Sequence, residues 1–118
     1  MFVNNAGIGF MMQPMLEVDP EDWAKVIAVN LSGAFYCTQA AGKAMIAAGK
    51  GGRIINIASQ AAKSAFPHLP AYVSSKHAVV GLTRQLAIEL APQRIRVLAI
   101  APSFIVTEGN LALMQAAP

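Results

Sequence analysis

Charged residues are scarce in this chain of 118 residues. Lys, Arg, Asp and Glu together make up 13% of it, whereas hydrophobic residues make up 55%. A soluble domain of average composition has about 25% charged and about 45–50% apolar residues. We therefore expect either the inner part of a larger domain or a chain that covers much of its surface by oligomerisation.

Other features that would assign a class are missing too. No apolar run approaches the roughly 18–20 residues of a membrane span, and the N-terminus has no signal-peptide pattern. A single cysteine, Cys37, cannot form an internal disulfide, so we expect a reducing, cytoplasmic location. The net charge of +3 is spread along the chain, which makes nucleic-acid binding unexpected. His68 and His77 lack Cys or acidic residues at metal-ligand spacing, so no metal site is predicted.

What is present is a regular alternation of strand and helix patterns. Asp19 and Pro20 are a strong helix start, and the apolar spacing predicts a helix from there to the glycines at 49–52. A second helix is predicted from Pro70 to about Leu90. Short apolar strands are predicted at 1–4, 53–58 and 95–100.

This order indicates one α/β domain over residues 1–118, a partial Rossmann-like parallel sheet with flanking helices and a β-α-β-α-β core. Because the strands are almost wholly apolar, we expect helices to cover both faces of the sheet. Ligands of such sheets bind beyond the carboxyl ends of the strands. Asn4-Asn5, Ser59 and Pro102-Ser103 fall at those ends.

Four polar residues are candidates for chemistry, each with a simpler alternative. Tyr72 and Lys76 share one helix face, where an ammonium can favour a phenolate base; the alternative is a surface pair. The Ser59 hydroxyl can donate a hydrogen bond to a substrate carbonyl, or it can cap a turn. Asn30 lies on an apolar stripe, either as a satisfied core amide or as a group that holds the backbone open for a water.

Two common motifs do not fit. Gly7-x-Gly9 lacks a third glycine and does not lead straight into a helix, so it is not a dinucleotide fingerprint. Ser59 lies between Ala58 and Gln60, not in the Gly-x-Ser-x-Gly elbow of hydrolases.

Five short segments are each weak signals alone, but their joint order is highly specific. They are Asn4-Asn5-Ala6-Gly7, Val29-Asn30, Ile55-Asn56-Ile57-Ala58-Ser59, Tyr72-Val73-Ser74-Ser75-Lys76 and Ile100-Ala101-Pro102-Ser103 with Thr107. Taken together, they resemble the short-chain dehydrogenase/reductase family over almost the whole chain.

The resemblance implies an NAD- or NADP-dependent oxidoreductase that acts on a small-molecule carbonyl/alcohol pair. It makes Tyr72 the acid/base, assisted by Lys76, which also binds the nicotinamide ribose. It implies that Ser59 positions and polarises the substrate oxygen. It also implies that Asn30 supports a water that links Lys76 to solvent. The remaining implied cofactor contacts are Asn4, Ala6, Gly7, Pro102, Ile105 and Thr107, and the implied substrate contacts are Gln60, Ala61, His68 and Phe104.

The sequence departs from the family pattern at its two ends. It holds no glycine-rich turn and little beyond the sixth strand of the family, so we expect the isolated chain to bind NAD(H) or NADP(H) weakly or not at all. Ser103 stands where a glycine is usual. The alternative is a truncated, non-catalytic fragment that only self-associates. The resemblance implies that the two long helices pair subunits, so a homo-oligomer is expected in either case. Extended-family epimerases share Tyr-x-x-x-Lys, but the other segments fit simple reductases better.

Overall fold

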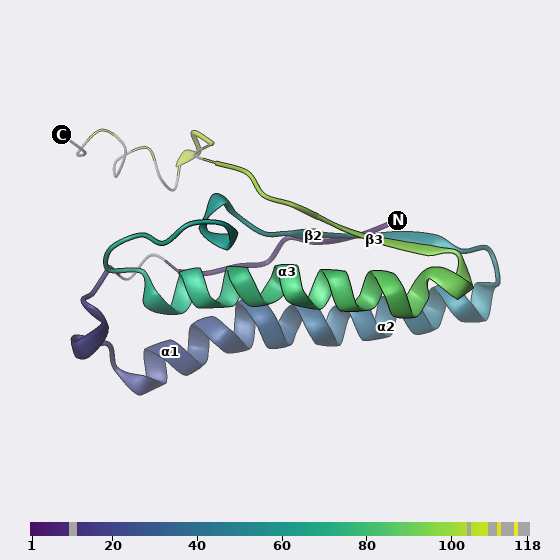
Figure 1. Cartoon of the computed structure of the whole chain (residues 1–118), viewed down its shortest axis with the longest axis horizontal. Helices are drawn as coiled ribbons and strands as arrows, with labels where there is room; N and C mark the ends of the chain where they lie inside the picture. The colour runs from purple at the N-terminus through teal and green to yellow at the C-terminus, as the bar shows by residue number, and fades with distance from the viewer. Residues whose placement is uncertain (10–11, 104, 109–110, 112–114, 116–118) are drawn as a thin grey trace.

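A computed structural model shows a three-stranded parallel sheet with helices packed on it (Figure 1). It describes residues 1–118 except 10–11, 104, 109–110, 112–114 and 116–118. The strands β1 (Phe2–Asn4), β2 (Gly52–Ile57) and β3 (Ile95–Ile100) lie in the order β1-β2-β3. Their carboxyl ends are therefore at one edge, and the predicted α/β, Rossmann-like class is confirmed.

The first predicted helix is interrupted, contrary to the single continuous helix predicted from the apolar spacing. It consists of α1 (Pro20–Ile27), a π-helical turn η2 (Ala28–Ser32) and α2 (Gly33–Ala48). The Asp19 carboxylate accepts a hydrogen bond from the Glu21 N–H at its start. Gly49, with φ of 71°, ends it in the left-handed conformation that glycine adopts readily.

The second helix, α3 (Pro70–Leu90), runs as predicted and is followed by the short η4 (Ala91–Gln93). Two further single turns, η1 (Met15–Glu17) and η3 (Gln60–Ala62), lie in the loops before α1 and after β2. No helix in the described part of the chain is long and apolar enough to cross a membrane.

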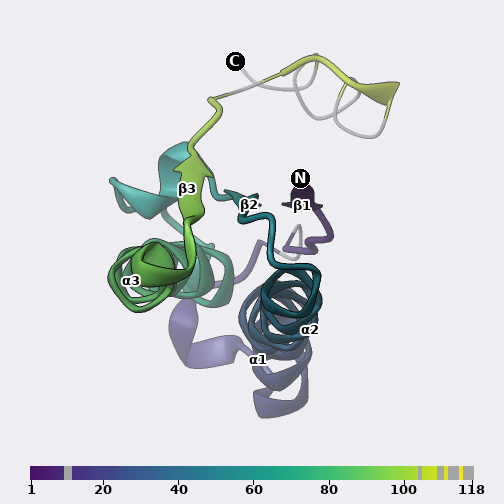
Figure 2. The same cartoon turned by 90° about the vertical axis from the view of Figure 1, so that its right-hand side faces the viewer.

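The helices α2 and α3 cover the same face of the sheet, and α1 packs against α3 on that side, so the prediction of two covered faces was wrong (Figures 1 and 2). On the other face Leu98 and Ile100 of β3 are 58% and 50% exposed. The topology explains this, because two right-handed crossovers that step in the same direction along a sheet place their helices on the same side. The apolar composition of the strands could not reveal it.

The core lies between the sheet and the helices. Ile54, Ile95 and Val97 form its centre, with Leu86 and Leu90 of α3 packed against them. On α2 the inward residues are small: Ala34, Thr38 and Gly42. The larger Trp23 of α1 and Phe35 and Ile46 of α2 are all exposed.

Polar side chains join the layers beneath the strand ends. The Asn4 amide donates to Thr38 Oγ1 (2.8 Å) and to Asn56 Oδ1 (2.9 Å). Asn56, which is completely buried, donates in turn to Thr83 Oγ1 (3.0 Å), and Thr83 donates to the Val79 carbonyl (2.8 Å). This network satisfies the buried amides and fixes β1 and β2 against α2 and α3.

Candidate active site

Tyr72 and Lys76 lie on the first two turns of α3, at the carboxyl edge of the sheet. Lys76 is only 5% exposed, and its ammonium group donates a 2.9 Å hydrogen bond to the carbonyl of Ile57, the last residue of β2. The Lys76 Nζ lies 5.8 Å from the centre of the Tyr72 ring. The alternative of an ordinary surface pair is therefore wrong for Lys76.

Burial is the main influence on this amine. Removal from water lowers the pKa of Lys76 below its ordinary value, because desolvation disfavours the charged form. Lys76 also lines a small cavity of about 80 Å³ together with Asn4, Ala6 and Asn30. About 10–15 Å³ of such space is enough to hold one water, so this cavity has room for water. The amine thus has a carbonyl partner on one side and space for solvent on another.

Asn30 lies inside the π-helical turn and is 2% exposed. Its Oδ1 accepts from the Ile8 N–H (2.8 Å), and its Nδ2 donates to the Ile8 carbonyl (2.7 Å) and to Ser75 Oγ (3.0 Å). The amide is fully engaged, as the satisfied-core alternative requires. It also holds the loop after β1 against α3, and it borders the small cavity beside Lys76.

Ser75, which was not predicted as a site residue, also belongs to this hydrogen-bond network. It is completely buried, accepts from Asn30 and donates to the Tyr72 carbonyl (2.8 Å). Its position one residue before Lys76, on the inner face of α3, was the available signal. Ser75 therefore connects the asparagine to the backbone of the tyrosine.

Ser59 directly follows β2, as predicted. Its hydroxyl oxygen accepts from the Ala61 N–H (3.1 Å) and caps η3, so the simpler alternative, a serine that caps a turn, is confirmed. A hydroxyl that accepts this bond still has its own hydrogen to donate. The capping bond fixes the oxygen at the strand end and leaves the donor function for another partner.

The ends of β2 and β3 are joined, which confirms that these segments converge. The Gln60 N–H donates to the Pro102 carbonyl (2.8 Å), and the Ser103 hydroxyl donates to Gln60 Oε1 (2.7 Å). Ile105 and Thr107 follow as exposed residues beyond this junction. Phe104, predicted as a substrate contact, lies outside the described residues.

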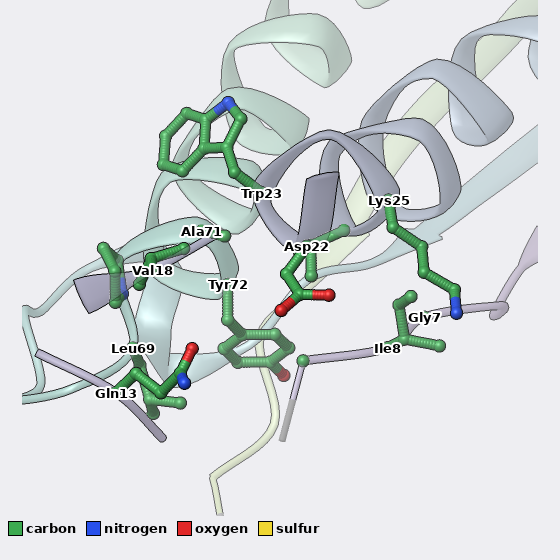
Figure 3. Close-up of a pocket in the computed structure, with 13 residues that line it drawn as sticks. Gly7, Ile8, Gln13, Val18, Asp22, Trp23, Lys25, Leu69, Ala71 and Tyr72 are labelled. Carbon is green, nitrogen blue, oxygen red and sulfur yellow. The ribbon is translucent and has the colours of Figure 1, made fainter. Parts of the chain in front are cut away.

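A larger cavity of about 480 Å³ opens beside Tyr72 (Figure 3). Tyr72 and Gly7 border it with the apolar Ile8 and Leu69, and Asp22 projects into the same region. The other predicted contacts, Ser59, Gln60, Ala61 and His68, do not line it. The exposed His68 has φ of 67° and contributes its carbonyl, which accepts from the Gln13 N–H (2.9 Å).

No group of three His, Cys, Asp or Glu side chains in the described ranges is arranged to hold a metal ion. The site therefore consists of a buried amine, a phenol, a hydroxyl and an amide at one edge of a parallel sheet. Such a set can exchange a proton with a substrate oxygen and orient that oxygen by hydrogen bonds.

Comparison with known proteins assigns this arrangement to a family. The model of the short chain dehydrogenases matches residues 1–117. The chain belongs to this family. The predicted resemblance, made on five short segments, is therefore confirmed over almost the whole sequence, and so is the kinship to NAD(P)-type oxidoreductases with a Rossmann-like fold.

Individual relatives give the extent of the match. D-threitol dehydrogenase of Mycolicibacterium smegmatis is 44% identical over 106 residues, which are 90% of this chain and 40% of that protein. A gluconate 5-dehydrogenase from Burkholderia cenocepacia in complex with NADP and tartrate has a TM-score of 0.91 at 39% identity, covering 98% of this chain and 44% of that one. The structure of 4-hydroxyisoleucine dehydrogenase complexed with NADH has a TM-score of 0.86 at 38% identity, covering 97% of this chain and 50% of that one. The chain thus spans about 40–50% of the length of these relatives.

Proposed function

We propose that this short-chain dehydrogenase sequence carries the catalytic site of an NAD(H)- or NADP(H)-dependent oxidoreductase acting on a carbonyl/alcohol pair. The observation that supports this most is the buried Lys76 ammonium beside the Tyr72 ring. Burying an amine costs free energy unless hydrogen-bond or charge partners offset it. Buried groups with a perturbed pKa cluster at catalytic sites.

Tyr72 is the proposed acid/base. In the oxidation direction its phenolate accepts the proton from the substrate hydroxyl, and in reduction the phenol returns the proton to the developing alkoxide. The Lys76 charge favours the phenolate. Waters in the small cavity lead the proton onward past Lys76 and Asn30, both of which border it. The π-helical turn at Asn30 supports this path, since such turns leave backbone groups outside the regular helical bonding pattern.

Ser59 is proposed to hold the substrate oxygen. Its oxygen accepts from the Ala61 N–H, which leaves its own hydrogen to donate. Donated to a carbonyl or alkoxide oxygen, this hydrogen bond strengthens as negative charge develops, which favours the transition state over the ground state.

The carboxyl edge of the sheet fits a nicotinamide coenzyme, which supplies or accepts the hydride. Ala6 and Gly7 are exposed and small, and a Cβ on Gly7 would lie 3.4 Å from Lys76 Nζ. The backbone there can approach a ligand closely. Asn4 borders the same cavity as Lys76, while Pro102, Ile105 and Thr107 follow β3. These six residues with Tyr72 and Lys76 are the proposed coenzyme contacts, and the structure favours neither NAD nor NADP.

The substrate is proposed to be a small hydroxylated molecule. The relatives are named for threitol, gluconate and 4-hydroxyisoleucine, all of which are small and carry hydroxyl groups. The cavity beside Tyr72 is bordered by both apolar and charged residues, which suits a molecule of mixed polarity. Gln60 and His68 lie on the neighbouring loops, where they remain candidates for substrate contacts.

The test is Tyr72→Phe in the protein as its gene encodes it, assayed for NAD(P)H formation with small polyols. General acid/base catalysis contributes about 100- to 10,000-fold, so kcat is expected to fall by at least about 100-fold with little change in coenzyme affinity. Tyr36→Phe, at an exposed position on α2, is the matched control and keeps its activity. Equal activity of Tyr72→Phe and the parent protein excludes Tyr72 as the acid/base.

The outer surfaces of the helices favour a second proposal, self-association of the chain. Phe35 and Tyr36 on α2 and Ile88 on α3 are exposed, large and hydrophobic or aromatic. Light scattering during size-exclusion chromatography is expected to show a dimer or larger species, and Tyr36→Glu with Phe35→Glu is expected to lower its mass. A monomer at micromolar concentration contradicts this proposal.

A further inference from the structure

Gly9 lies against the ring of Tyr72. A Cβ built on Gly9 falls 2.1 Å from Tyr72 Cδ2, 2.7 Å from its Cγ and 3.0 Å from its Cβ. Carbon atoms in contact are ordinarily about 3.5–4.0 Å apart. No side chain fits at position 9 unless the ring or the loop moves.

The side chain of Asn30 holds the loop in place at this point. Asn30 bonds both the N–H and the carbonyl of Ile8, at 2.8 and 2.7 Å, and so fixes both backbone groups of the residue before Gly9. The same amide donates to Ser75, which donates to the Tyr72 carbonyl. One buried side chain thus fixes the tyrosine from two directions, through its backbone and through the loop that touches its ring.

We infer that Gly9 is a positioning residue for Tyr72. The inference rests on the acid/base role proposed above. Without a side chain at position 9, the loop closes onto the ring and sets where the phenol stands relative to Lys76 and the large cavity, which Gly9 and Tyr72 both line. A side chain there displaces the ring, and displacements of about 1 Å at a reacting group cost about 100-fold in rate.

The first experiment needs no catalysis. The chain has two tyrosines, so in a Tyr36→Phe background the ring signals of a ¹³C-tyrosine NMR spectrum belong to Tyr72 alone. Gly9→Ala is expected to shift these signals. The control is Gly81→Ala on α3, where a Cβ meets nothing within 4 Å and the ring signals stay in place. Ring signals of Gly9→Ala that superimpose on those of the parent overturn the inference.

A double-mutant cycle covers the case in which Gly9→Ala does not fold. Tyr72→Ala removes the two nearest ring atoms and leaves only the 3.0 Å contact with the Cβ of residue 72. Gly9→Ala is therefore expected to destabilise that background much less than the parent chain, even if it unfolds the parent. If Gly9→Ala unfolds the Tyr72→Ala chain as completely as it unfolds the parent, a clash with the ring is contradicted.

The second experiment reads catalysis in the protein as encoded. Gly9→Ala is expected to lower kcat by about 10- to 100-fold with a nearly unchanged KM for the coenzyme. In the Tyr72→Phe background it is expected to lower the residual activity no further, because it acts through the phenol. Additive losses in the two backgrounds overturn the inference. If the parent shows no dehydrogenase activity, the proposed function fails, whereas the NMR comparison still decides the role of Gly9.

Discussion

The ammonium group of Lys76 donates a 2.9 Å hydrogen bond to the carbonyl oxygen of Ile57. This bond joins the second turn of α3 to the last residue of β2. It takes a cation out of water and places it where the sheet ends. Its energetic consequence can be measured separately from any catalysis.

Lys76 makes stability depend on pH in a defined direction. Because burial lowers its pKa in the folded chain, the unfolded chain binds more protons between that lowered pKa and about 10.4. In this window the contribution of Lys76 to the free energy of unfolding rises with pH, by at most about 1.4 kcal/mol per pH unit. Below the window, the full cost of the buried charge is present.

Urea unfolding of the parent and Lys76→Met from neutral pH to about pH 10 measures this contribution. The free energy of unfolding of the parent, minus that of Lys76→Met, is expected to increase as the pH rises. Lys63→Met removes an exposed lysine, and its free energy of unfolding is expected to depend on pH in the same way as that of the parent. A constant difference between parent and Lys76→Met at all pH values contradicts the lowered pKa.

Two adjacent serines on α3 provide the next comparison. Ser75 is buried between Asn30 and the Tyr72 carbonyl, whereas Ser74 is exposed. Ser75→Ala leaves the Asn30 donor without its acceptor, which costs about 1–3 kcal/mol of unfolding free energy. Ser74→Ala is expected to stay within about 0.5 kcal/mol of the parent. Denaturant titration of both variants checks this, and similar losses would show that Ser75 holds nothing in place.

Two glycines with the same φ of 71° separate backbone strain from steric collision. A Cβ on Gly49 meets nothing within 4 Å, so Gly49→Ala is expected to cost only the left-handed strain of about 1–2 kcal/mol. A Cβ on Gly51 falls 2.5 Å from the Arg94 carbonyl oxygen. Gly51→Ala is therefore expected to lose about 1–3 kcal/mol more, measured by thermal or urea unfolding. Equal losses would mean that the loop before β2 shifts freely.

Two isoleucines measure the core. Ile54 is completely buried in the sheet, and Ile88 on α3 is 75% exposed. Removal of one methylene by Ile54→Val is expected to lower the unfolding free energy by about 0.5–1.5 kcal/mol, and Ile88→Val by less than about 0.5 kcal/mol. A larger effect at Ile88 in concentrated protein than in dilute protein would locate that residue in a contact between chains.

The sequence predicted most of the elements, because capping residues, glycine stops and apolar spacing are local signals. Asp19 and Pro20 mark the start of α1, and Gly49 marks the end of α2. It also predicted that Asn30 and Lys76 matter, through their place in a joint pattern. The bare face of the sheet was not predictable, because it depends on strand order, a property that the residues Leu98 and Ile100 do not encode.

The site was predicted in outline but not in its connections. Composition and spacing could place Ser59 at a strand end, but could not show that Ala61 uses its oxygen. The contact of Gly9 with Tyr72 joins residues that are 63 positions apart in the sequence. Such a contact follows from tertiary packing, for which a single sequence has no local signal.

The π-helical turn at Ala28–Ser32 also sets the phase of the helix. An α-helix advances about 100° per residue, and a π-helical turn takes up one residue more than an α-helical turn does. Compared with an uninterrupted α-helix of the same residues, α1 is therefore rotated by about 100° relative to α2. Deleting one residue of this turn other than Asn30 would let an uninterrupted α-helix form in which α1 still presents the same side to α3. A one-residue deletion within α1 that left the π-helical turn in place would instead rotate the residues before it by about 100° and turn their side chains away from α3.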